Sequence, residues 1–202
     1  MKASINRKMK KAELVYRELL YQVIEKKNRT LTQAGLARTL NVSLSTVNSA
    51  IKKLESLGAV NIKPRAFKVI DVKKVLYFWA STRNLQKDII YETRIEKPVK
   101  EIEKLMPDTV IFGAYTAHKF LFKDVPADYS EVYVYGDESL KERFKEFKGT
   151  PNFFVLKKDE QIEKYGKTTT IANTFVDLWN LKEWYSKEFI KAMEERLHGI
   201  LE

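Results

Sequence analysis

The amino-acid sequence predicts a two-domain protein of the α+β or α/β class, in which a small helical domain precedes a small mixed sheet packed with helices. Between residues 30 and 70, two helix patterns are followed by two short strand patterns. From residue 97 onward, short apolar strands alternate with helices, which indicates an αβ domain around a small sheet. The charge is divided in the same way, because residues 1–70 carry 15 Lys and Arg against 4 Asp and Glu, and residues 71–202 carry 22 against 23.

These observations divide the 202 residues into a first domain over 1–70, a connecting helix or linker over 71–96, and an αβ domain over 97–202. A hydrophobic content of 44% is sufficient for real cores. The absence of cysteine excludes disulfides, thiol catalysis and cysteine-based zinc sites. There is no apolar run long enough to span a bilayer and no signal-peptide pattern, so the sequence predicts a cytoplasmic protein without a membrane association.

The first domain begins with the basic segment Met1–Lys11, which is either a frayed tail or an arm that contacts phosphates. Residues 11–27 predict a helix. Two shorter helices follow: Thr32 is placed to cap the first, and Ser43 the second, because a hydroxyl can accept a backbone N–H left free in the first turn. The buried stripe expected for the second helix is Val47, Ala50, Ile51, Leu54 and Leu57, and Gly58 then ends the helix with positive φ.

Residues 59–62 and 67–70 read as two strands joined by the basic turn Lys63–Ala66. Helix, turn, helix and hairpin together resemble a winged helix-turn-helix DNA-binding domain, and the net charge of +11 over residues 1–70 fits a phosphate-binding module. A recognition helix needs polar groups for base edges and cations for phosphates. The expected DNA-binding residues are Thr32, Gln33, Ser43, Ser45, Thr46, Asn48, Ser49, Lys52, Lys53, Lys63, Arg65 and Lys68. The alternative is a small helical domain whose lysines form only a solvated face.

The connecting segment predicts a helix that Asp71 caps and that is rich in large apolar side chains, among them Phe78 and Trp79. It either joins the domains by burial within one chain or serves as a dimerisation helix. Residues 85–93 are either a short strand or the end of this connector.

In the αβ domain, strands are expected at 109–112, 129–135 and 152–156, and helices at 98–106, 114–122, 139–147, 170–181 and 181–201. Tyr129, Tyr133 and Tyr135 would share one face of a strand, either as core or as an exposed patch. Trp179 is expected to be buried, and Asp177 to cap or pair locally.

The segments Phe112–Tyr115 and Ser130–Val134 resemble the nucleotidyltransferase fold, in which a Gly-Ser pair after one strand holds a nucleotide triphosphate and an Asp-x-Asp on the next strand holds Mg²⁺. Here Ala114 stands at the serine position, and Glu131 and Tyr133 stand at the two carboxylate positions. Tyrosine cannot replace an anionic Mg²⁺ ligand. The resemblance therefore implies a degenerate, non-catalytic relative. Two alternatives stay open: an ordinary αβ domain, and an active nucleotidyltransferase that a winged helix targets to nucleic acid or protein.

The order of segments through the whole chain, with Thr168–Trp179 as the best local match, looks like the antitoxin and regulator family of the AbiE type. In that family the first domain binds the operon's own promoter and the second opposes a partner nucleotidyltransferase toxin. The resemblance implies double-stranded DNA as a partner, with a toxin or other protein as a further one. A homodimer is also consistent with half-site recognition.

Other candidate sites are weak. His118 and His198 are isolated, so they predict no zinc site, and His118 is expected to be packed or hydrogen-bonded. Asp124, Asp128, Glu131 and Asp137 favour a solvated acidic edge over a cation site. We therefore expect no catalytic residues, no metal and no cofactor.

Overall fold

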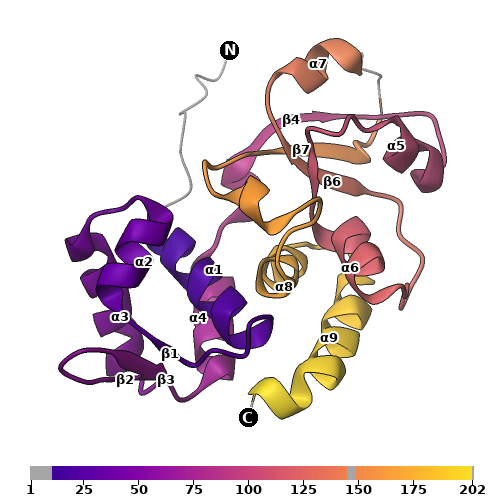
Figure 1. The fold of residues 1–202 in the computed structure, drawn as a ribbon. Helices are drawn as coiled ribbons and strands as arrows, with labels where there is room; N and C mark the ends of the chain where they lie inside the picture. Colours follow the sequence, from indigo (N-terminus) through magenta and orange to yellow (C-terminus); the bar gives the residue numbers. More distant parts are fainter. Residues whose placement is uncertain (1–10, 145–148, 202) are drawn as a thin grey trace.

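The N-terminal part folds as a helix-turn-helix with a wing (Figure 1). In this computed structural model, which describes residues 11–144 and 149–201, helices α1 (Lys11–Ile24), α2 (Gln33–Leu40) and α3 (Leu44–Ser56) precede strands β2 (Val60–Ile62) and β3 (Phe67–Val69). A further strand, β1 (Thr30–Leu31), pairs with β3 and gives the sheet order β1-β3-β2. The sequence pattern did not indicate β1. The basic segment Met1–Lys11 lies, apart from Lys11, outside the described residues.

Local side-chain chemistry fixes the ends of α2 and α3, and here the sequence predictions are confirmed. The hydroxyl of Thr32 accepts from the backbone N–H of Gly35 at 3.0 Å, and that of Ser43 accepts from Thr46 N at 3.2 Å. Gly58 has φ of +68°, the left-handed conformation that glycine adopts at low cost. Leu57 is a correction: its side chain is 41% exposed, because α3 ends at Ser56 and the buried stripe stops at Leu54.

The C-terminal part is built on a mixed sheet with strand order β4-β7-β6-β5. Its strands are β4 (Ile89–Thr93), β5 (Ile111–Phe112), β6 (Val132–Gly136) and β7 (Phe153–Lys157), and β6 and β7 run parallel. Strand β4 lies within the segment expected to connect the domains, so the sheet begins before residue 97. The pairing continues at its end, where the side-chain amide of Asn152 exchanges hydrogen bonds with the backbone of Ile95.

Helices cover both faces of this sheet (Figure 1). Val132 and Val134 face α5 (Val99–Leu105) and α7 (Ser139–Arg143) in one core. Tyr133 and Tyr135 face the opposite core with α6 (Ala114–Phe122) and α8 (Ile171–Trp179), so the tyrosine face is core. Tyr129 precedes the strand and instead stacks on Tyr115. Helix α7 is shorter than expected, and residues 145–148 lie outside the described ones.

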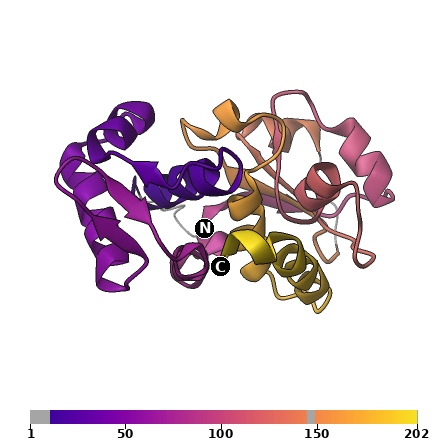
Figure 2. The ribbon, with the colours of Figure 1, turned by 60° about the horizontal axis from the view of Figure 1, so that its bottom comes forward.

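The remaining elements join the two parts. Helix α4 (Val72–Thr82), capped by Asp71, packs on α1 and α8, and α9 (Ser186–Leu201) lies beside α8. Figure 2 shows α1 and α4 along the junction between the winged helix and the rest. Trp79 is fully buried there, which supports the interpretation of α4 as an element buried within one chain. Short helical turns η1 (Leu85–Asp88) and η2 (Ile162–Tyr165) complete the chain. Trp179 is a second correction: as the last residue of α8 it is 42% exposed.

Candidate nucleic-acid interface

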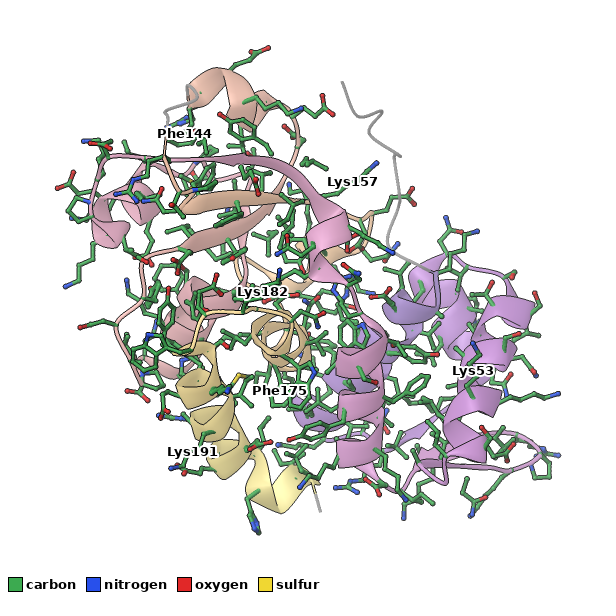
Figure 3. The ribbon with its side chains drawn as sticks, turned by 180° about the vertical axis from the view of Figure 1, so that it is seen from behind. Lys53, Phe144, Lys157, Phe175, Lys182 and Lys191 are labelled. Carbon is green, nitrogen blue, oxygen red and sulfur yellow. The ribbon has the colours of Figure 1, made fainter. Side chains whose placement is uncertain are left out.

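Beyond its first residue, the outer face of α3 is polar because the apolar residues of the helix interior point inward. Val47, Ala50, Ile51 and Leu54 are 1% exposed or less. At 100° per residue the opposite side of the helix presents Ser45, Ser49 and Lys52, all exposed. Thr46 and Asn48 flank this face and are half-buried. Figure 3 shows Lys53 of α3 at the far end of the molecule from Lys191 of α9.

Two hollows border this face of α3. A hollow of about 600 Å³ lies between the first turns of α2 and α3 and the hairpin, with Thr32, Gln33, Leu44, Lys63 and Arg65 in its lining. A second hollow, of about 300 Å³, lies on the other flank, between the start of α1 and the side chains of Ser45, Thr46, Ser49 and Lys53. The structure therefore places most of the predicted residues around the two hollows. The predicted residues that line neither hollow are Ser43, Asn48, Lys52 and Lys68.

The cations of this surface have no internal partners within residues 11–144 and 149–201. The side chains of Lys52, Lys53, Lys63, Arg65 and Lys68 are exposed and form neither ion pairs nor hydrogen bonds with other described residues. Free cations can neutralise phosphates without first losing an internal ion pair. The hydroxyls of Thr32 and Ser43, by contrast, are engaged as helix caps, and that of Ser43 also lies 2.8 Å from the hydroxyl of Thr46.

Behind this surface, buried charges attach the winged helix to the αβ part. The guanidinium of Arg17 in α1 donates to both oxygens of Asp159, at 2.6 and 2.7 Å, and both side chains are buried. Burial opposes ionisation of Asp159, but the hydrogen bonds and charge of Arg17 lower the pKa of this carboxyl below its usual value. Glu25, at the end of α1, accepts from the backbone N–H of Ile171 at the start of α8.

A second buried cluster surrounds Arg83 at the end of α4. Its guanidinium lies 3.0 Å from Glu13, 2.9 Å from Asp88, 3.1 Å from the Tyr135 hydroxyl and 3.8 Å from Asp177. Tyr135 donates to Asp177 at 2.8 Å and accepts from the amide of Asn173. Burial raises the pKa of Asp177 to about 7, although Arg83 acts in the opposite direction. The expectation that Asp177 pairs locally is wrong, because Tyr135 lies 42 residues away.

The residues at the nucleotide-binding and Mg²⁺-binding positions of the nucleotidyltransferase resemblance are buried or contact other residues of this protein. Gly113 and Ala114 are buried, and a Cβ on Gly113 would lie 3.1 Å from the ring of Tyr135 and 3.3 Å from the Asp177 carboxylate. Tyr133 is 2% exposed and stacks on Phe154. Glu131 accepts from the hydroxyls of Ser130 and Tyr185. The described residues contain no group of three or more acidic or histidine side chains placed to hold a metal ion.

His118 and acidic residues considered as further candidate sites make contacts within the protein. His118 is buried against Phe122 and Phe189, with Nδ1 3.3 Å from the backbone oxygen of Asp124, and burial lowers its pKa. The prediction that His118 is packed or hydrogen-bonded is therefore confirmed. On the acidic edge, Asp124 pairs with Arg196 at 2.6 Å.

Comparison with known proteins agrees with the N-terminal geometry. Residues 17–71 match the family described as "HTH domain", a span that runs from within α1 through the hairpin to the cap of α4. No curated protein and no solved structure matches the chain. The N-terminal part is thus a helix-turn-helix domain, and this supports a DNA-binding regulator. No helix among the described residues is long and apolar enough to cross a membrane.

Proposed function

We propose that this protein is a sequence-specific transcriptional regulator that binds double-stranded DNA through α3 and the β2–β3 hairpin. The observation that carries the proposal is the position of its charge: residues 1–70 carry a net charge of +11, and the rest carries −1. The exposed cations of α3 and the hairpin lie around a helix-turn-helix and have no partners among the described residues. A cytoplasmic location is part of this proposal.

Within this proposal, different side chains have different roles. Ser45, Thr46, Asn48 and Ser49 contact base edges, because hydroxyls and amides provide the donors and acceptors that distinguish base pairs. The phosphate contacts come from Lys52, Lys53, Lys63, Arg65 and Lys68. Thr32, Gln33 and Ser43 lie at the starts of α2 and α3, where free backbone N–H groups favour phosphate oxygens.

Selection of bound duplexes from a random DNA pool tests sequence specificity, and a palindromic result would indicate a homodimer. The contacts are then tested by the salt dependence of binding. Lys52→Ala and Arg65→Ala should each weaken affinity and lower the slope of log K against log [salt] by about one unit. Lys191→Ala is the matched control, since it removes an exposed lysine of α9 at the far end of the molecule and should leave the slope unchanged. Equal slopes for all three variants and the parent would refute this interface.

An antitoxin that regulates its own operon is the finer form of the proposal. It rests on the resemblance in the order of segments along the chain. The best-matching segment adds little to it, since Phe175, Val176 and Leu178 are buried and their apolar character is explained by fold stability alone. Co-purification of a nucleotidyltransferase encoded beside this gene would support it, and its absence from stable complexes would favour a stand-alone regulator.

The alternative of an active nucleotidyltransferase is disfavoured by the buried Gly113–Ala114 turn and by Tyr133 at a carboxylate position. Incubation with labelled nucleoside triphosphates and Mg²⁺ tests it. Transfer activity that disappears in Glu131→Ala would establish the alternative, and no transfer above background would exclude it.

A further inference from the structure

One large apolar side chain at the start of α3 is exposed, although it is in register with the buried stripe of the helix. Leu44, the first residue of the helix, is 54% exposed, whereas Val47, Ala50, Ile51 and Leu54 are buried. Single exposed apolar residues are common on protein surfaces and usually need no explanation. The position of Leu44 is different, because it lies where a recognition helix meets its ligand.

The backbone directs Leu44 toward that ligand. Side chains of a helix tilt toward its N-terminus, so the side chain of the first residue extends past the end of α3. Leu44 lines the hollow of about 600 Å³ together with Gln33 of α2 and with Lys63 and Arg65 of the hairpin. Recognition helices place their N-terminal residues against base edges in the major groove. The cations on the hairpin side of the same hollow would hold the adjoining phosphates.

The chemistry of the major groove supplies a partner for an apolar side chain there. Each base edge offers hydrogen-bond donors or acceptors, and thymine alone adds an apolar group, the C5 methyl. Ser45, Asn48 and Ser49 provide the hydrogen-bonding groups of this surface, and a leucine has none. Burial of Leu44 against a polar base edge would cost desolvation without a compensating hydrogen bond.

We propose that Leu44 contacts the C5 methyl group of a thymine and thereby specifies a T·A pair at one position of the DNA site, a step that rests on the proposed function. Leu44 is then a specificity-determining residue. The competing roles for this side chain are packing against the sugar–phosphate backbone and contact with another protein, and neither depends on a thymine methyl.

The test uses the full chain and the duplex obtained by selection. Each thymine near the α3 footprint is replaced singly by deoxyuridine, which removes only the methyl group. One replacement should weaken binding by about three- to fivefold, the effect of one buried methyl-sized group. In Leu44→Ala, the duplexes with thymine and with deoxyuridine at that position should bind equally. Leu57→Ala is the matched control, because it shortens the other exposed leucine at the opposite end of α3 and should preserve the thymine preference.

The outcomes separate this inference from the function on which it rests. Selection of a defined sequence with no thymine whose methyl matters would overturn the inference and leave the regulator intact. A thymine preference that persists in Leu44→Ala would assign the methyl contact to another residue and also overturn it. Failure to select any sequence would refute the proposed function itself. Since Leu44 is exposed, the variant should fold, and its unfolding curve should overlay that of the parent.

Discussion

The winged helix and the adjoining helix α4 carry cations in two settings, one exposed and one buried. On the outer side, the cations of α3 and the hairpin are exposed and unpaired within the described residues. On the inner side, Arg17 and Arg83 are buried, and each lies against carboxylates of other elements. Positive side chains are therefore available to bind DNA on the outer side, and on the inner side they hold elements of the fold together. Position in the fold decides between the two, because a buried cation without its anion is costly and an exposed one is hydrated.

The largest expected effect comes from removing the anion of the inner surface. Asp159→Ala would leave Arg17 buried and unpaired, and the free energy of unfolding should fall by about 3–5 kcal/mol. Urea unfolding measures the loss. Lys52→Ala, on the outer surface, is the control and should change stability by less than about 0.5 kcal/mol. Similar losses in the two variants would remove the distinction between the surfaces. Replacing both partners, in Arg17→Met with Asp159→Leu, should recover much of the stability.

A pH-dependent effect is expected from Asp177, which adjoins Arg83. Because burial raises its native pKa to about 7, above the unfolded value of about 3.9, the native state holds an extra proton between these pH values. The free energy of unfolding should therefore decrease as pH rises from 4 to 7, by up to about 1.4 kcal/mol per pH unit from this group. Unfolding series at several pH values should show this slope reduced in Asp177→Asn. An unchanged slope would mean that Asp177 is ionised throughout. Asp159 has a lowered pKa and acts with the opposite sign, below about pH 4.

The smallest effect separates structure from recognition within α3 itself. Ser43→Ala removes a helix cap and should cost about 1 kcal/mol of stability. Ser49→Ala, on the exposed face, should leave stability unchanged or slightly raised, since alanine favours helices, while weakening DNA binding. Urea unfolding and a binding titration of both variants make the comparison. A cost in stability from Ser49→Ala equal to that from Ser43→Ala would argue that the face is structural.

The features that sequence reasoning predicted are those that depend on short-range interactions. The caps at Thr32 and Ser43 and the positive φ at Gly58 each need only residues within one helical turn. Strand β1 escaped prediction because two residues show no periodicity, and only its pairing with β3 defines it. Helical periodicity alone places Leu57 and Trp179 on buried faces, but Leu57 follows the last residue of α3 and Trp179 is the last residue of α8, and both are exposed.

The buried ion pairs could not be predicted from local pattern at all. Arg17 and Asp159 are 142 residues apart, and each alone resembles an ordinary surface residue. Leu44 is absent from the DNA-binding residues expected from the sequence for a different reason, because that expectation includes only polar and charged side chains. Helical periodicity gives no signal of its exposure, since Leu44 lies three residues before Val47 and seven before Ile51, in register with the buried stripe.

The contact between Arg17 and Asp159 also has a consequence for the order in which the protein is made. Ribosomes add roughly 5–20 residues per second, so roughly 7–28 s separate the synthesis of Arg17 from that of its carboxylate. During this interval α1 lacks both Asp159 and the α8 backbone that Glu25 caps. The surface that we propose for DNA binding is therefore synthesised before the residues that hold α1 in place. A nascent chain that has not yet reached Asp159 carries the cations of α3 and the hairpin on a winged helix that still lacks its supporting contacts.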